Sequence, residues 1–423
     1  MTLDYETIHK TFKFINMFCF GYPFVMAWYW ITGSFLYFLI RERHEPPAGI
    51  PPALPAYPFV SVLLPCFNES EQLEETMSVL MQLDYPNFEV IAINDGSSDD
   101  TATILNSLLM RYPKLRVAHL VENQGKSTAL NTGLFLSKGE ILVCIDGDAL
   151  LDPHAATWFV RYFQTNKNIG ALTGNPRIRN RSTLLGRLQI GEFSSIVGMI
   201  KRTQTVYGSL FTVSGVICAF RKAAVMEAGF WSPGAMTDDV DLTLRIQSAG
   251  WDVAFEPKAL CWILMPEKLK GLWRQRLRWS EGGSQAVLKV TKEIVSKRAW
   301  GLVPILLNFY VSTIWAFCIL GSIAFWCAMK SLGLDVDDSL SPIPDWWGTI
   351  LSCTYLFQSI IGLMLDSRYE KGILKSFAWI IWYPLLYWLM QSTTAALGFL
   401  RALKRPAQAK GTWISPDRGI KDD

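Results

Sequence analysis

Four long stretches of the chain contain no charged residue, and this feature constrains the fold more than any other. Each is rich in apolar and aromatic side chains and provides the roughly 20 residues that a helix needs to cross a hydrocarbon core of about 30 Å. A buried core helix seldom runs so far without a polar residue, so these stretches are predicted to lie in a membrane. They are Phe14–Ile40, Gly301–Met329, Trp346–Leu365 and Ser376–Leu400.

The composition and the order of these stretches give a domain plan. The 423-residue chain is 50% hydrophobic and only 18% charged, whereas about a quarter of the residues in soluble domains are charged. The net charge of +3 is too small to favour a nucleic-acid partner. The plan comprises a membrane helix within residues 1–44, a proline-rich linker at 45–58, a soluble domain at 59–300, three membrane segments within 301–400 and a basic tail at 401–423.

Basic residues beside the membrane stretches predict their orientation. Arg41 and Arg43 follow the first stretch, and four basic residues between 289 and 298 precede the second. Because positive residues favour the cytoplasmic side, we expect the soluble domain in the cytoplasm. Ser376–Leu400 leaves two alternatives open. Either it crosses the bilayer and places the basic tail outside, or Pro384 kinks it and returns the tail to the cytoplasm.

Strand and helix signals alternate in the soluble domain. Four short runs of apolar residues are separated by helical stretches rich in Glu, Leu, Thr and Ala. This order predicts an α/β domain with a mostly parallel sheet and right-handed crossovers. Such sheets bind ligands at the carboxyl ends of their strands. The four runs are Val60–Leu64, Phe88–Ile93, Arg116–Val121 and Ile141–Ile145.

Carboxylates follow three of these runs. Glu69 lies beyond the first, Asp95 beyond the second, and Asp146 and Asp148 come directly after the fourth. One acidic turn is ordinary turn chemistry, but three turns at the same sheet edge indicate a binding site. No P-loop or dinucleotide fingerprint follows a strand, which disfavours those two classes of nucleotide-binding protein.

Asp146 and Asp148 are predicted to bind a divalent metal ion. Residues i and i+2 of an extended chain point the same way, and Gly147 between them lets a ligand approach the backbone. Two carboxylates together with phosphate oxygens suit Mg²⁺ or Mn²⁺, which would neutralise a diphosphate leaving group. Lys126, at a predicted helix start, is interpreted either as a phosphate contact or as a solvated surface lysine.

Two later segments carry further candidates. Thr237–Asp239 opens a predicted helix, where its acids either favour the helix dipole or include a general base for a sugar hydroxyl. Gln275, Arg278 and Trp279 share one helical face, where a guanidinium can bind a diphosphate and an indole can support a sugar ring. This helix and the amphipathic segment Leu185–Thr205 are expected either to lie on the bilayer or to pack against the sheet.

In order and spacing, these motifs resemble those of the processive family 2 glycosyltransferases, which include the cellulose, chitin and hyaluronan synthases. The resemblance covers the whole soluble domain and implies a nucleotide-sugar-binding GT-A-like fold. The shared motifs are Asn94–Ser97, Asp146–Asp148, Thr237–Asp239 and Gln275–Trp279. A narrower resemblance, to bacterial poly-β-1,6-N-acetylglucosamine synthases, rests on Gly174–Arg177, Gly191–Ser195, Lys201–Gln204, Cys261–Pro266 and Trp413–Gly419.

The family resemblance also implies a role for each candidate residue. The family usually has Thr-Glu-Asp where this chain has Thr237–Asp239, a departure that concerns Asp238 and leaves the base position intact. The implied catalytic base is Asp239; the nucleotide-sugar contacts are Glu69, Asp95, Lys126, Asp146 and Arg278; the acceptor contacts are Ser214, Gln275 and Trp279; and the metal ligands, for Mg²⁺ or Mn²⁺, are Asp146 and Asp148.

The resemblance implies an activity and partners as well. The expected reaction is the inverting, processive transfer of N-acetylglucosamine from UDP-GlcNAc to a growing β-1,6-linked poly-GlcNAc chain, a biofilm exopolysaccharide, at the bacterial inner membrane. The expected partners are the lipid bilayer, a small two-helix membrane subunit and cyclic di-GMP bound at the subunit interface. Three alternatives remain open: another membrane polysaccharide synthase, a transferase that forms a lipid-linked monosaccharide, and a nucleotide-binding membrane transporter. None of the four stretches carries an intramembrane charge, which disfavours the transporter.

Overall fold

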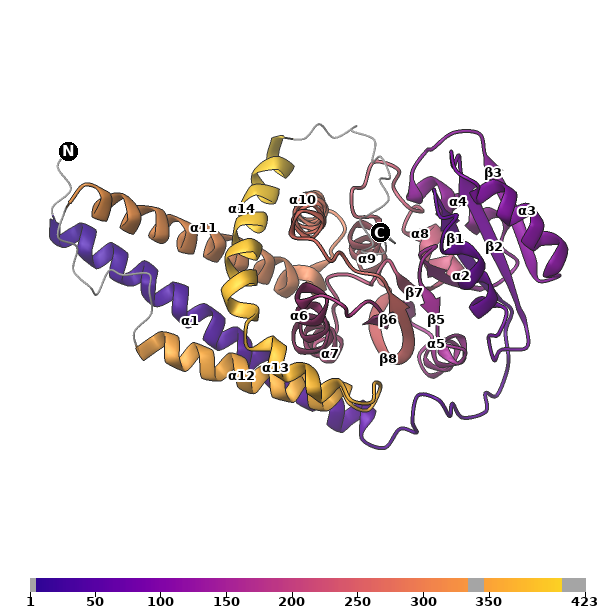
Figure 1. Cartoon of the computed structure of the whole chain (residues 1–423), viewed down its shortest axis with the longest axis horizontal. Helices are drawn as coiled ribbons and strands as arrows, with labels where there is room; N and C mark the ends of the chain where they lie inside the picture. The colour runs from indigo at the N-terminus through magenta and orange to yellow at the C-terminus, as the bar shows by residue number, and fades with distance from the viewer. Residues whose placement is uncertain (1–4, 334–345, 405–423) are drawn as a thin grey trace.

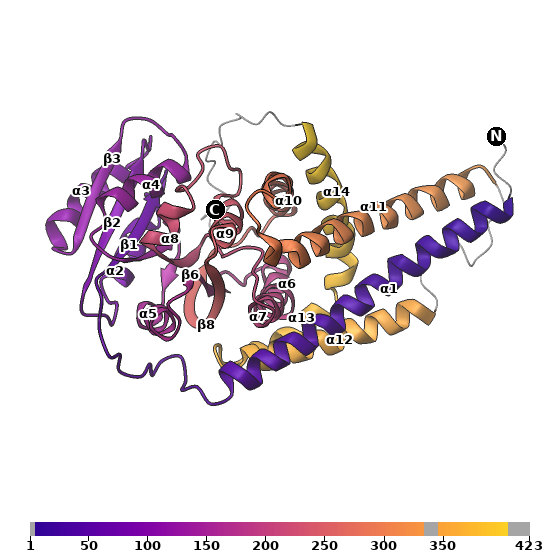
Figure 2. The same cartoon turned by 180° about the vertical axis from the view of Figure 1, so that it is seen from behind.

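The computed structural model of the chain describes residues 5–333 and 346–404. A sheet with flanking helices forms one part of the molecule, and long helices that extend away from it form the other (Figure 1 and Figure 2). The predicted basic tail from residue 405 onward, including Trp413–Gly419, lies outside the described residues.

The strands of the described chain are β1 (Val60–Cys66), β2 (Phe88–Asp95), β3 (Leu115–Leu120), β4 (Ile141–Ile145), β5 (Leu150–Leu151), β6 (Ile169–Ile178), β7 (Ile217–Arg221) and β8 (Asp252–Ile263). They form one sheet in the order β3-β2-β1-β4-β7-β6-β8-β5. β1 to β4 pair in parallel, as expected. β7 is antiparallel to both β4 and β6, β5 is antiparallel to β8, and β6 and β8 are parallel. The α/β fold is confirmed, and the sheet beyond β4 is mixed.

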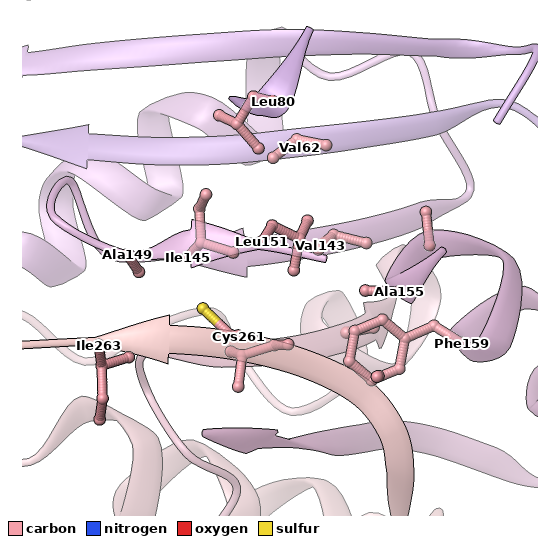
Figure 3. Packing of buried hydrophobic residues seen from close by; sticks show 14 of the residues in the cluster. Val62, Leu80, Val143, Ile145, Ala149, Leu151, Ala155, Phe159, Cys261 and Ile263 are labelled. Atoms are coloured by element: carbon pink, nitrogen blue, oxygen red, sulfur yellow. The ribbon is translucent and has the colours of Figure 1, made fainter. Parts of the chain in front are cut away.

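Helices cover both faces of this sheet. They are α2 (Leu73–Leu80), α3 (Thr101–Arg111), α4 (Lys126–Leu136), α5 (Ala155–Thr165), α8 (Lys222–Glu227) and α9 (Asp238–Ser248). Because side chains alternate along a strand, Val62 and Val143 join the core beneath α2 and α5 (Figure 3). Leu63 and Leu142 join a second core beneath α4 and α9. Burial on both faces explains why these strands are continuous apolar runs.

Three helical segments in the described chain are long and apolar enough to cross a membrane. They correspond to α1 (Tyr5–Tyr37) with the turn that follows it, α11 (Val303–Ser331) and α12 (Trp346–Asp366). The apolar segments span His9–Glu42, Trp300–Ser331 and Trp346–Asp366 and contain the first three stretches predicted from the sequence. All three helices extend to the same side of the sheet (Figure 1 and Figure 2).

The fourth predicted stretch, Ser376–Leu400, does not form one straight helix. It is divided into α13 (Phe377–Ile380), a π-helical turn at Pro384–Trp388 and α14 (Leu389–Lys404). Proline removes a backbone donor and clashes with the preceding turn, so the chain changes direction at Pro384. The structure therefore shows a break in the helix at Pro384; the side of the membrane on which the basic tail lies stays a prediction. After this bend α14 runs away from α12 and lies against α11 (Figure 1).

α14 packs against α10 (Leu269–Glu293), a long helix of the soluble part. A glycine permits this close crossing. A Cβ atom at Gly398 would lie 2.6 Å from Cβ of Ser280 and 2.7 Å from the backbone nitrogen of Glu281. α14, the last helix of the described chain, thus packs on α10 directly after the segment Gln275–Trp279.

The segment Leu185–Thr205 packs against other elements with buried charged residues. It forms α6 (Leu184–Glu192), a π-helical turn and α7 (Met199–Val206). α7 lies against α1 and β8, and the Thr203 hydroxyl donates to the Trp30 carbonyl of α1 at 3.0 Å. Lys201 and Arg202 are buried. Of the two alternatives predicted for this segment, the structure shows packing against the sheet and α1.

Gly398→Ala is expected to destabilise the protein, because the added methyl group overlaps the α10 backbone, and overpacking typically costs about 1–3 kcal/mol. The matched control is Gly321→Ala on α11, where an added Cβ meets nothing within 4 Å. The control should be neutral or stabilising, since alanine favours a helix over glycine by about 1 kcal/mol. Thermal unfolding of detergent-purified protein measures both; equal midpoints would contradict a tight crossing.

Candidate active site

The ends of β1, β2 and β4 place three acidic segments at one edge of the sheet. β1 and β2 pair in parallel as far as Cys66 and Asn94, and β1 pairs in the same direction with β4. The chain after β1 then approaches the turn after β4. A Cβ atom at Gly147 would lie 2.9 Å from Cγ of Glu69. Glu69 thus packs against Asp146–Asp148, as the register of parallel strands requires.

Asp95, at the end of β2, is fully buried and holds a neighbouring loop in place. Its carboxylate oxygens accept the N–H groups of Gln124 at 2.9 Å and Gly125 at 2.8 Å. Burial raises the pKa of Asp95, and these two hydrogen bonds oppose that shift. Gly125 has φ +90°, a conformation that favours glycine, and α4 begins at the next residue. Asp95 therefore fixes the loop that presents Lys126 to the site.

Lys126 points into the site and not into bulk solvent. Its ammonium group donates to the Asp146 carboxylate at 2.5 Å and to the Gly215 carbonyl at 3.1 Å, and its side chain is 18% exposed. Burial alone would lower the pKa of Lys126. The carboxylates of Asp146, Asp238 and Asp239 outweigh that effect and raise it. Lys126 is therefore a fixed positive charge beside the acidic turn after β4.

Asp239 lies in the first turn of α9, close to the same lysine. Its carboxylate accepts the Gly215 N–H at 3.3 Å and the Val240 N–H at 2.9 Å. Burial and the adjacent Asp238 carboxylate raise the pKa of Asp239 to about 6, although Lys126 and the two hydrogen bonds oppose the shift. A carboxylate with such a pKa is well matched to a general base near neutral pH.

The residues at the acidic turn fit a divalent metal ion. In the described part of the chain, no group of three His, Cys, Asp or Glu side chains could hold a metal; the ligands predicted from the sequence are the two carboxylates Asp146 and Asp148. The Lys126 ammonium already on Asp146 shows that this position favours a cation. Two carboxylates, with the remaining positions filled by phosphate oxygens and water, suit Mg²⁺.

α10 brings the segment Gln275–Trp279 near the start of α9. A Cβ atom at Gly282 would lie 2.6 Å from the Thr237 side chain, so Trp279 lies one helical turn from the contact with the acidic helix start. Arg278 and Trp279 are exposed, as binding side chains must be. Gln275 is partly buried, and its Oε1 atom has no hydrogen-bond partner among the described residues.

Arg276, a buried residue of this motif, is not among the candidates predicted from the sequence. Its guanidinium pairs with the Glu192 carboxylate of α6 at 2.7 Å, and both side chains are 4% exposed. The same guanidinium lies 4.5 Å from the centre of the Trp279 ring. Arg276 therefore links α10 to α6 through an ion pair and contacts the indole of Trp279. Helical periodicity contained a signal, because Arg276 falls between Leu272 and Leu277 on the apolar face.

The predicted acceptor contact Ser214 has two partners that the sequence analysis did not assign to the site. The buried Lys201 ammonium donates to the Ser214 hydroxyl at 2.6 Å and to the Thr173 hydroxyl at 2.9 Å. The Ser214 N–H also donates to the Thr173 hydroxyl, at 2.9 Å. The available signal was a Lys-Arg pair inside an otherwise apolar segment.

Known proteins match this chain along nearly its whole length. A poly-β-1,6-N-acetyl-D-glucosamine synthase of Staphylococcus epidermidis is 35% identical over 411 residues, which cover 94% of this chain and 97% of that protein. The protein of the same name in Staphylococcus aureus strain COL is 34% identical over 413 residues, which cover 96% and 99%.

The fold is also found in a solved structure. A mannosyltransferase from Pyrobaculum calidifontis, in complex with GDP-Man and Mn²⁺, matches 93% of this chain and 99% of its own with a TM-score of 0.60 and 18% identity. This likeness confirms the glycosyltransferase fold expected from the sequence. Residues 55–282, more than half of the chain, match the family described as "Glycosyltransferase like family 2". With this match and relatives above 30% identity along nearly their whole length, the chain belongs to the family 2 glycosyltransferases.

Proposed function

We propose that this glycosyltransferase transfers N-acetylglucosamine from UDP-GlcNAc, with inversion, to the 6-hydroxyl of a growing β-1,6-linked poly-GlcNAc chain. The choice of sugar and linkage is supported by the two staphylococcal relatives, which match this chain from end to end. The observation that carries the reaction type is the meeting of Asp239 and Lys126 at the two sides of one glycine, Gly215.

In this proposal Asp239 is the general base. The acceptor hydroxyl gives its proton to the Asp239 carboxylate while its oxygen attacks the anomeric carbon and the bond to the diphosphate breaks. One displacement at an α-linked donor yields a β linkage, which is the inverting outcome. The carboxylate suits this role because it is only partly buried, lies at a helix start and has a pKa of about 6.

Several residues are proposed to hold the leaving group. Lys126 and Arg278 supply positive charge to the diphosphate, and Asp146 and Asp148 would hold Mg²⁺ or Mn²⁺ with it. The metal, when bound, would neutralise charge on the departing diphosphate. Glu69, whose side chain packs on the acidic turn, is assigned with Asp95 to the uridine end of the donor.

The acceptor end of the polymer is assigned to α10 and to the turn before β7. Trp279 offers an exposed indole, 37% accessible, above the buried Arg276 guanidinium. A flat apolar ring of this kind can stack on a sugar. Gln275 is assigned to the acceptor as well; its Oε1 atom is buried and has no hydrogen-bond partner among the described residues. Ser214 lies beside the Gly215 contact to the base.

The soluble part is proposed to face the cytoplasm of a bacterial cell, at its inner membrane. Arg41 and Arg43, at the end of the first membrane segment, support this orientation. A growing polysaccharide, the bilayer and a small two-helix membrane subunit are the proposed partners. Cyclic di-GMP is proposed to act at the subunit interface.

Asp239→Asn is expected to lower the rate of polymer formation about 10²- to 10⁴-fold, because the general base is lost, while UDP binding persists. The assay supplies radiolabelled UDP-GlcNAc to the membrane-embedded enzyme and identifies the product by linkage analysis. Asp252→Asn, at the exposed start of β8, is the control and should retain activity. Normal polymer synthesis by the Asp239 variant, or another sugar or linkage in the product, would overturn the proposal.

The rate should depend on pH through Asp239. The base acts in its ionised form, so kcat/KM is expected to rise as the pH increases through about 6. Asp238→Asn removes the negative neighbour that raises this pKa, so the acidic limb should move to lower pH. The pH dependence of kcat/KM, measured for both proteins, checks the direction of this shift. An acidic limb that moves to higher pH in the variant would contradict the assignment of Asp239 as the base.

Chelation of divalent metal is expected to stop sugar transfer, and added Mg²⁺ or Mn²⁺ should restore it. Asp148→Asn should raise the metal concentration needed for half-maximal rate, because one of the two proposed carboxylate ligands becomes a neutral amide. Titration of the metal against initial rate measures this. An unchanged titration curve in the variant would remove Asp148 from the metal site.

A further inference from the structure

Lys201 is a buried charged residue with no part in the proposed reaction. It belongs to α7, outside the sheet, and is 5% exposed. Burial lowers the pKa of Lys201 to about 7, although the nearby Asp239 carboxylate opposes the shift. Burying an amine is costly unless it is hydrogen-bonded. The hydrogen-bond partners of Lys201 therefore indicate its role.

Those partners form a closed set of hydrogen bonds. The Lys201 ammonium bonds the hydroxyls of Thr173 on β6 and Ser214 before β7, at 2.9 Å and 2.6 Å. The Thr173 hydroxyl also accepts the Ser214 N–H, at 2.9 Å. The Phe255 ring lies 5.9 Å from the ammonium. Ser214 is thus fixed through its backbone and its side chain at once.

Gly215, the residue after this serine, is hydrogen-bonded to two charged side chains of the site. Gly215 donates its N–H to the Asp239 carboxylate at 3.3 Å and accepts the Lys126 ammonium at its carbonyl oxygen at 3.1 Å. One peptide segment therefore separates the proposed base from the proposed phosphate-binding lysine. A shift of Ser214 would move both contacts.

α7 is itself held firmly by the two residues that follow Lys201. Arg202 pairs with Glu42 at the end of the first membrane segment, at 2.8 Å, and with Asp366 at the end of α12, at 2.9 Å. Thr203 donates to the Trp30 carbonyl of α1. Three consecutive residues thus join the turn before β7 to two membrane helices. Lys201 therefore lies on a helix that is fixed in position.

We propose that Lys201 is a positioning residue for sugar transfer, which sets the Ser214–Gly215 turn and through it the separation of Asp239 and Lys126. This inference rests on the proposed function for the roles of those two groups. A lysine that merely fills the interior would contribute to stability alone. A positioning lysine affects kcat, the rate at which bound substrate reacts, because small displacements of reacting groups slow the chemical step.

The test compares Lys201→Met, Thr173→Val and the double variant in the full-length, membrane-embedded enzyme. Lys201→Met keeps the apolar length of the side chain and removes the donor. We expect kcat for polymer formation to fall about 100-fold, while KM for UDP-GlcNAc stays within about threefold, the pattern of an interaction that acts in the transition state. Thr173→Val removes the shared hydroxyl and should lower kcat in the same way.

The double variant should be little slower than Lys201→Met, because both changes release the same turn and their effects are not additive. Lys222→Met is the matched control: this lysine donates to the Ser137 carbonyl, at 2.8 Å, on the far side of the domain, and its loss should leave kcat unchanged. If Lys201→Met fails to accumulate, Thr173→Val still decides the inference through its kcat.

Normal kcat in Lys201→Met or Thr173→Val would overturn the inference, as would additive losses in the double variant. The unmodified enzyme, assayed in parallel, separates this outcome from a failure of the proposed function. Absence of poly-GlcNAc from the unmodified enzyme contradicts the proposed function. Equal synthesis by the unmodified enzyme and the Lys201 variant contradicts the inference alone.

Discussion

Two arginines are buried where the long helices meet the sheet, and the arrangement of the molecule depends on their pairing. Arg202 of α7 reaches Glu42 and Asp366, and Arg177 of β6 reaches the same Asp366 at 2.5 Å and Glu370 at 2.7 Å. A buried arginine without a carboxylate is strongly destabilising. These pairs therefore require that the ends of the first membrane segment and α12 remain beside the sheet, in one relative position.

That fixed position is what makes a membrane-attached active site possible. α7 passes from the ion pairs to the turn before β7, and α10 is held to α6 by the buried pair of Arg276 and Glu192. In the proposed site the acidic strand ends bind the donor, and α10 supplies the exposed indole of Trp279.

The sequence predicted most of the elements and much of the site composition. The strand runs up to Ile141–Ile145 form strands, and the acids after them lie at one edge, because parallel pairing of apolar runs forces their carboxyl ends together. The kink at Pro384 was foreseen as one of two possibilities. Lys126, read either as a phosphate contact or as a surface lysine, proved to point into the site.

The sequence by itself determined three helices apolar enough to cross a membrane, the α/β domain and the acidic residues at its edge, since these follow from local composition and from strand periodicity. The tertiary structure alone decided which charges are buried and paired. Lys201, Arg202 and Arg276 read in sequence as polar residues of amphipathic helices, yet they face inward. Their carboxylate and hydroxyl partners lie from 13 to 164 residues away. Local patterns do not contain such distant pairings, so only the folded chain revealed how the site is held.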